Sequence, residues 1–416
     1  MPSATLKRRF TKRVPTTKPL QSTERTTVEL FAGAGGLALG LRLAGCRHKV
    51  TVEFNKFACD TLRLNWRSTS DDAPSIYEGD VRRFDYRRFR ECIDSDIDGV
   101  TGGPPCQPFS LGGVARGCDD GRNMFPEAAR AVAELQPKFF LFENVKGLLR
   151  ENFADYFQYV LSQLACPCLK IKETETWREH FSRIQRTLVD AKTLDERLTY
   201  QVAFKLFDAA DYGAPQRRFR VFIAGFRSDL NLVPEFPQPT HSFDKKIWDQ
   251  WVSEEYWEQH KIPKTCRPEM SPIEGRRVQE LRRQFGLFPP PGKRWTTVRD
   301  ALHNLPDPET PNNVPNHEFR PGARPYPGHT GSGYDEPSKA LKAGVHGVPG
   351  GENMIAFPDG SYRYYTPREA ARIQTFPDEY VFCGPTSETM RQIGNAVPVV
   401  LAKSVGSHIL RQLEEA

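Results

Sequence analysis

The chain lacks paired cysteines and long apolar stretches. Its nine cysteines are scattered, and the two closest, Cys166 and Cys168, have no second pair at the spacing of a zinc site. We therefore expect reduced thiols, as in a reducing compartment, and no bound metal. No apolar run reaches the ~18 to 20 residues that cross a bilayer, and the first residues lack the apolar segment of a secretory signal. These absences favour a cytoplasmic protein without membrane contact.

The composition that remains is that of a globular protein. Of the 416 residues, 38% are hydrophobic and 26% are charged, which argues against a disordered chain. The length favours two domains rather than one. The net charge of +6 is compatible with a polyanionic partner, but many proteins without such a partner have a similar excess.

The texture of the sequence divides the chain into four segments. Residues 1–26 are basic, with Pro, Ser and Thr between the charges and no apolar periodicity, so this arm is either a solvated tail or a phosphate contact. Residues 27–227 alternate between strand and helix patterns. Residues 228–362 are rich in Pro, Gly, Trp and charge, which predicts a loop-rich second domain or a large insertion. Regular patterns return in residues 363–416, which we expect to complete the first domain.

Alternating strands and helices predict an α/β fold with a doubly wound, mostly parallel sheet. We expect strands at residues 27–30, 49–53, 99–101, 139–143, 200–207 and 220–224. Helices are expected after the first strand, through Leu37, Leu39, Leu41 and Leu43, and at residues 124–135 and 397–413.

A glycine-rich turn follows the first expected strand. It reads FAGAGGL, residues 31–37, and it allows the backbone to approach a ligand where the next helix begins. Glu53 ends the next strand, where a carboxylate can accept both hydroxyls of a ribose. Asp80, followed by Val81, is placed to face an adenine amino group. These acids are otherwise ordinary residues at strand ends, so the turn alone is only a weak indication of a nucleotide-like cofactor.

Cys106 stands out from the other cysteines because prolines surround it. It lies in GGPPCQPFS, residues 102–110, just after an expected strand. The prolines exclude a helix or a central strand and make the loop stiff. A buried structural cysteine does not need such a frame. Ligands bind at the carboxyl edge of parallel sheets, so this thiol is a candidate nucleophile.

With these residues, the sequence resembles the DNA (cytosine-5) methyltransferases, in particular those of bacterial type II restriction–modification systems. Six motifs occur in the order of that family over roughly residues 27–227 and 364–413. They are the glycine turn, the Cys106 loop, Glu143-Asn144-Val145, QRRFR at residues 216–220, REAARIQ at residues 368–374, and GNAVP at residues 394–398.

The resemblance implies a Rossmann-like S-adenosylmethionine-dependent fold and assigns roles to residues. Cys106 would add to cytosine C6, Glu143 would protonate or hydrogen-bond N3, and Arg218 and Arg220 would hold the base. The target cytosine would have to leave the duplex before the reaction. Residues expected to contact S-adenosylmethionine are Phe31, Ala32, Gly33, Gly35, Gly36, Leu37, Glu53, Asp80, Val81, Pro104, Met124, Asn395 and Ala396.

The resemblance also implies partners. Residues 228–362 would form a target-recognition domain that reads double-stranded DNA, and residues 335–354 are similar to readers of GC-rich palindromes. The enzyme would act as a monomer and protect host DNA from a cognate endonuclease, without forming a stable complex with it. Three alternatives stay open: a tRNA cytosine-5 methyltransferase, an inactive DNA-binding regulator of the same fold, and, from the glycine turn alone, a nicotinamide-dependent oxidoreductase.

Overall fold

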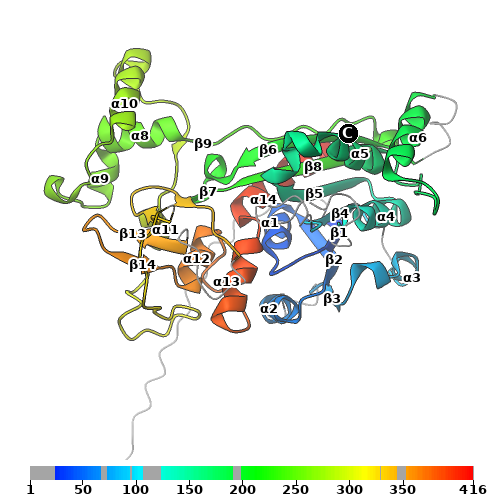
Figure 1. The fold of residues 1–416 in the computed structure, drawn as a ribbon, viewed down its shortest axis with the longest axis horizontal. Coiled ribbons are helices and arrows are strands. Elements are labelled where there is room, and N and C mark those ends of the chain that lie inside the picture. Colours follow the sequence, from blue (N-terminus) through cyan, green and yellow to red (C-terminus); the bar gives the residue numbers. More distant parts are fainter. Residues whose placement is uncertain are drawn as a thin grey trace, which may run out of the picture.

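The fold is that of a computed structural model, drawn in Figure 1. The structure describes residues 24–66, 73–93, 96–105, 123–190, 198–327, 329–343 and 353–415. Residues 1–23 of the predicted basic arm lie outside the described residues, as do Cys106 and the loop that follows it. The same holds for residues 344–352 within the predicted recognition domain.

A seven-stranded sheet forms the centre of the larger part of the molecule. Its strand order is β3-β2-β1-β4-β5-β8-β6. Strand β8 runs opposite to the other six strands, which share one direction. The mostly parallel sheet is therefore confirmed. The strands are β1 (Arg25–Leu30), β2 (Cys46–Glu53), β3 (Ser75–Glu78), β4 (Gly99–Gly102), β5 (Phe139–Val145), β6 (Tyr200–Asp208) and β8 (Phe219–Arg227).

Helices cover both faces of this sheet, as the doubly wound prediction requires. Successive side chains of a strand point to opposite faces. On β5, Phe140 and Phe142 join the core on one face, while Phe139 and Leu141 join the core on the other. The first face carries α3 (Tyr86–Glu91), α4 (Phe125–Leu135), α5 (Ala154–Ala165) and α6 (Trp177–Val189), and the second carries α1 (Gly36–Ala44) and α14 (Val399–Glu414). A smaller cluster joins α2 (Lys56–Trp66) to α1.

An early and a late part of the chain meet where α1 packs on α14 (Figure 1). The contact is close because glycine faces it: a Cβ on Gly40 would lie 2.4 Å from the Cβ of Ala402. Within the described residues, one stretch, Thr386–Glu414, is long and apolar enough to cross a membrane, but 67% of its apolar window is buried inside the protein. It comprises α13 (Thr386–Asn395) and α14, which pack as core helices.

The segment from residue 228 to 362 consists of short helices and short strands joined by long loops. Its helices are α8 (Phe243–Trp251), α9 (Glu255–Gln259), α10 (Pro272–Phe285) and α11 (Val298–Leu302). Short strands accompany them: β9 (His241–Ser242), β10 (Lys293–Arg294), β11 (Ser332–Gly333), β12 (Ser338–Lys339), β13 (Met354–Ala356) and β14 (Tyr362–Tyr364). We did not predict the helices α8 and α10, which share a small core of Ile247, Trp248, Val278 and Leu281.

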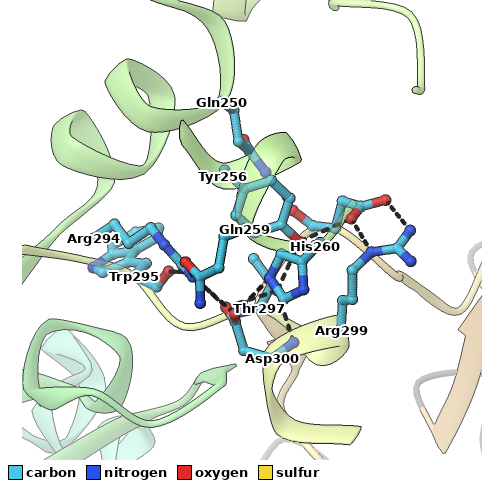
Figure 2. A network of polar contacts seen from close by, with 10 residues as sticks. Gln250, Tyr256, Gln259, His260, Arg294, Trp295, Thr297, Arg299 and Asp300 are labelled. Carbon is cyan, nitrogen blue, oxygen red and sulfur yellow. Dashed lines mark hydrogen bonds and ion pairs between the residues drawn. The ribbon is translucent and has the colours of Figure 1, made fainter. Parts of the chain in front are cut away.

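A polar network fixes α9 against α11 (Figure 2). The buried Tyr256 hydroxyl donates to Asp335 at 2.8 Å and lies 2.9 Å from the Thr297 hydroxyl. Arg299 binds both oxygens of Asp335 at 2.6 and 3.0 Å. Because the buried Tyr256 hydroxyl and the Asp335 carboxylate are both hydrogen-bonded, the network stabilises one arrangement of these helices.

The segment from residue 228 to 362 also packs directly on the larger part of the molecule, which contains the seven-stranded sheet. β12 pairs in parallel with β7 (Gln216–Arg217), which immediately precedes β8. In addition, Val298, Leu341 and Ile355 share one core with α12 (Pro367–Ile373) and α13.

Candidate active site

The predicted site residues gather at the carboxyl edge of the parallel strands. β1, β2, β4 and β5 end there, and the reversed strand β8 begins there, with Arg220 opposite Val145. The turn after β1, Glu53, the proline loop, Glu143 and Arg220 therefore belong to one side of the sheet. Ligand sites of such sheets lie on this side.

The glycine turn adopts conformations that favour glycine. Gly33 and Gly35 have φ of +54° and +84°, and Phe31 has φ of +55°. A side chain at Gly35 would collide with Leu62 and with the hydroxyl of Tyr380, whereas nothing lies within 4 Å of a Cβ at Gly33. The backbone at Gly33 is therefore open on the side where a ligand would approach, and α1 begins at Gly36.

Both predicted acids are held by hydrogen bonds. Glu53 accepts from the backbone amides of Gly33 and Asn55, each at 2.7 Å. Asp80 accepts from the amide of Arg82 at 3.0 Å and from its guanidinium. These bonds to Arg82 lower the pKa of Asp80. Val81 is buried beside it. Glu53 thus lies directly at the glycine turn, while the carboxylate of Asp80 is occupied by its neighbour.

Residues 363–416, which we call the closing segment, reach the same turn from the other end of the chain. A Cβ on Gly36 would lie 2.5 Å from the carbonyl oxygen of Val397 and 3.0 Å from the Cβ of Ala396. Asn395 is exposed next to them. Tyr380, which we did not predict, donates to the carbonyl of Ala34 at 2.6 Å. No local sequence signal identifies Tyr380, because its role arises only when the two ends meet.

The proline loop is anchored at both of its described ends. The carbonyl of buried Pro104 accepts from the Asn144 side chain at 2.9 Å. The carbonyl of Pro105 accepts from the backbone amide of Met124 at 3.3 Å. Met124 is the N-cap residue of α4 and is partly buried. The segment that carries Cys106 therefore leaves and re-enters the described structure at neighbouring points.

Glu143 and Arg220 form an ion pair beside this loop. Arg220 Nε lies 2.5 Å from Glu143 Oε1, and both side chains are nearly buried. The other carboxylate oxygen would lie 3.2 Å from a Cβ on Gly103, three residues before Cys106. Burial raises the pKa of Glu143, although Arg220 and Arg218 oppose this change. Glu143 is thus a buried acid with an increased tendency to hold a proton.

The other two arginines of the motif do not contact Glu143. Arg218, 2% exposed, donates to the backbone carbonyls of Leu341, at 2.9 Å, and of Gly394. Arg217 pairs with Asp208 and lies over the ring of Trp295, 4.6 Å from its centre. The structure thus brings together Glu143 and Arg220 but directs Arg218 away from them, toward two other segments of the chain.

Comparisons of the sequence with known proteins agree with one another. The family model for C-5 cytosine-specific DNA methylases matches residues 25–166 and 182–411. The type II methyltransferase M.PspPI of Psychrobacter sp. (strain TA137) is 32% identical over 398 residues, covering 94% of this chain and 80% of that protein. M.Eco47II of Escherichia coli, also a type II methyltransferase, is 31% identical with the same coverage.

Solved structures resemble the fold. A prophage-encoded Escherichia coli protein assigned as a DNA modification methyltransferase has a TM-score of 0.55 at 23% identity, covering 94% of this chain and 99% of that one. The Dnmt2 methyltransferase of S. pombe has a TM-score of 0.52 at 18% identity, with the same coverage. At these identities the likeness concerns the fold alone.

Proposed function

The chain belongs to the family of C-5 cytosine-specific DNA methylases, and from this we infer what its individual residues do in the transfer of a methyl group to cytosine C5. The observation that supports the assignment best is local. The buried carboxylate of Glu143 lies beside Gly103, at the base of the Cys106 loop, and pairs with Arg220. An acid and a cation thus lie beside the described residues that lead into the predicted nucleophile.

The glycine turn fits S-adenosylmethionine, which supplies an electrophilic methyl group when bound. The open side of Gly33 leaves room for a ligand against the backbone, and the Glu53 carboxylate at the same place suits ribose hydroxyls. Gly36, Ala396 and the exposed Asn395 extend this surface from the other chain end. The proposed contact set also includes Phe31, Ala32, Gly35, Leu37, Asp80, Val81, Pro104 and Met124.

We assign the nucleophile to Cys106. Its thiolate forms a bond to cytosine C6, and the electrons of the C5–C6 double bond move into the ring toward N3. Glu143 provides a proton or hydrogen bond at N3, and Arg220 stabilises the negative charge near the base carbonyl. C5 is then nucleophilic enough to take up the methyl group. Loss of the C5 proton to solvent and departure of the Cys106 thiolate restore the C5–C6 double bond, and N3 returns its proton to Glu143.

The substrate is proposed to be a cytosine flipped out of double-stranded DNA, because a stacked base gives Cys106 no path to C6. Residues 228–362, which we call the recognition segment, would read the surrounding sequence. The enzyme would act as a monomer. The names of its relatives favour a type II restriction–modification role, in which methylation protects host DNA from a cognate endonuclease.

Transfer of tritium from labelled S-adenosylmethionine tests the chemistry. We expect label in DNA and none in tRNA, and no label in DNA from Cys106→Ser. Cys266→Ser is a matched control, because Cys266 is an exposed cysteine of the recognition segment and should not affect transfer. A duplex containing 5-fluorocytosine should trap a covalent adduct with the wild type only.

Each alternative has its own outcome in this experiment. Label in tRNA alone would identify a tRNA methyltransferase, and binding of DNA without any transfer would identify an inactive regulator. Undiminished transfer by Cys106→Ser would remove the nucleophile assignment. Bisulfite sequencing of plasmid from expressing cells then reveals the recognition sequence. Protection of that sequence from a restriction enzyme tests the biological role.

A further inference from the structure

Three segments that are far apart in the chain meet at one buried point. We call this point the junction and define it by five residues: Gln216, Arg218, Leu341, Gln374 and Gly394. All of them are buried. Gln216 and Arg218 come from the arginine motif, residues 216–220. Leu341 comes from the recognition segment. Gln374 and Gly394 come from the closing segment.

Arg218 joins the recognition segment to the closing segment. One terminal nitrogen donates to the carbonyl of Leu341 at 2.9 Å, and the other donates to the carbonyl of Gly394. Both terminal nitrogens are thus engaged by protein, and neither carbonyl belongs to β7 or β8, between which Arg218 lies. Without these acceptors, the buried Arg218 charge would lose its hydrogen bonds, which is costly. The bonds therefore favour one arrangement of the recognition segment and the closing segment.

The two glutamines of the junction reinforce this arrangement. Gln216 accepts from the amide of Leu341 at 3.0 Å and donates to the side chain of Gln374 at 2.9 Å. Gln374 in turn donates to the carbonyls of Ile393 at 2.7 Å and Ala396 at 3.2 Å. The last of these is a residue that adjoins the glycine turn.

The recognition segment also presses directly on the closing segment. A Cβ on Gly394 would lie 2.6 Å from the backbone nitrogen of Ala343, so the two backbones touch. Asn353 binds both the amide and the carbonyl of Lys342 at 3.0 Å, which holds the recognition segment at this point. A displacement of Leu341 or Lys342 therefore cannot occur without moving Gly394, next to the proposed cofactor residues Asn395 and Ala396.

We propose that Arg218 is a positioning residue that couples DNA recognition to cofactor binding, rather than a group that touches the base. The inference rests on the proposed function. DNA that engages the recognition segment fixes Leu341, and through Arg218 it fixes Gly394 and the cofactor surface beyond it. By reciprocity, bound cofactor raises the affinity for the recognised sequence.

The test measures this coupling in the full-length protein. The affinity for S-adenosylhomocysteine is determined by calorimetry, with and without a saturating duplex that carries the sequence found by bisulfite sequencing. We expect the duplex to tighten binding to the wild type by about fivefold or more, which is within the usual range for coupled sites. In Arg218→Lys the factor should fall close to one.

Two comparison variants separate positioning from other roles. Arg183→Lys changes an arginine of α6 that binds Glu175 and the carbonyl of Lys170, both far from the junction in the chain. It should lose thermal stability but keep the coupling factor. Arg220→Lys should lower the single-turnover rate at saturating ligands and likewise keep the coupling. If Arg218→Lys does not fold, Gln216→Glu, which keeps the acceptor for Leu341 but loses its donors, should reduce the coupling instead.

The outcomes distinguish the two proposals. Equal coupling in wild type, Arg218→Lys and Gln216→Glu would overturn the positioning role, as would a wild type without coupling that still methylates DNA. A lower single-turnover rate in Arg218→Lys with unchanged coupling would return Arg218 to the base. A wild type that neither binds S-adenosylhomocysteine nor methylates DNA would refute the proposed function, and the positioning role with it.

Discussion

At the scale of single residues, the chemistry depends on how Glu143 keeps its proton. Burial favours the neutral carboxylic acid, while Arg220 and Arg218 favour the carboxylate. The net effect is a raised pKa, so the reactive protonated form persists to higher pH than for an exposed glutamate and is lost as pH rises through that pKa. A raised pKa suits a group that donates a proton to N3.

Replacement of Glu143 by glutamine tests this role. We expect Glu143→Gln to lower the single-turnover methylation rate by roughly 10²- to 10⁴-fold, because the amide cannot transfer a proton. The wild-type rate should decline with rising pH, whereas the variant rate should not depend on this group. Quenched-flow measurements over a pH series that begins near 4.5, the ordinary pKa of a glutamate, provide both profiles. A wild-type rate without an alkaline decline would contradict the assignment.

A second buried acid, Glu29 on β1, affects stability rather than chemistry. It is fully buried, accepts from Thr101 at 2.9 Å, and burial raises its pKa to about 8. Since the folded pKa exceeds the unfolded one, its stabilising contribution is complete below about pH 4.5 and is lost as pH rises to about 8.

We therefore expect wild-type unfolding free energy to fall between pH 5 and 8, and Glu29→Gln to remove roughly 2 to 4 kcal/mol of that decline. Urea denaturation at both pH values measures the difference. Glu258→Gln, at an exposed position of α9, serves as the control and should leave the decline unchanged. The same decline in Glu29→Gln as in the wild type would refute the linkage.

Sequence reasoning predicted the site at this scale only where a motif carries the chemistry. The approach of Glu143 to the Cys106 loop and of Gly36 to Ala396 follows from the order of motifs along an α/β sheet. The partners of Arg218 and the role of Tyr380 were not predictable, because each depends on contacts between segments more than 120 residues apart.

At the scale of elements, the contact of α1 with α14 depends on small residues. A Cβ on Gly40 would meet backbone atoms, lying 2.7 Å from the carbonyl oxygen of Val399. We expect Gly40→Ala to lower the unfolding free energy by roughly 1 to 3 kcal/mol, despite the better helix propensity of alanine. Thermal melting is the measurement, and Leu43→Ala, at an exposed position of α1, should change stability by less than about 0.5 kcal/mol. An unchanged melting temperature in Gly40→Ala would show that the two helices can separate without cost.

Most central strands were predictable because they are apolar on both faces, and all six expected strands extend by only a few residues at either end. The short strand β3 was missed, since its side chains are half-buried or exposed and leave no apolar run. Helix α10 was missed although the sequence contains a signal for it. Ser271 and Glu274 form a capping box, with proline at the first helical position.

At the scale of the whole molecule, residues 363–416 complete a core that begins at β1. Leu37 and Leu41 of α1 share that core with Leu401 and Val405 of α14. We expect a fragment of residues 1–362 to expose this apolar surface and to aggregate or bind a hydrophobic dye. Co-expression of residues 363–416 should restore a soluble complex that copurifies. A soluble fragment 1–362 with a native near-ultraviolet spectrum would contradict this expectation.

The position of the closing helix also has a consequence for synthesis on the ribosome. Gly36 is made early, but its neighbours Ala396 and Val397 emerge only after the whole recognition segment has been translated. Under the proposed function, the surface for the methyl donor thus cannot form in a nascent or prematurely terminated chain. No incomplete product would modify cytosines without first having the segment that selects them.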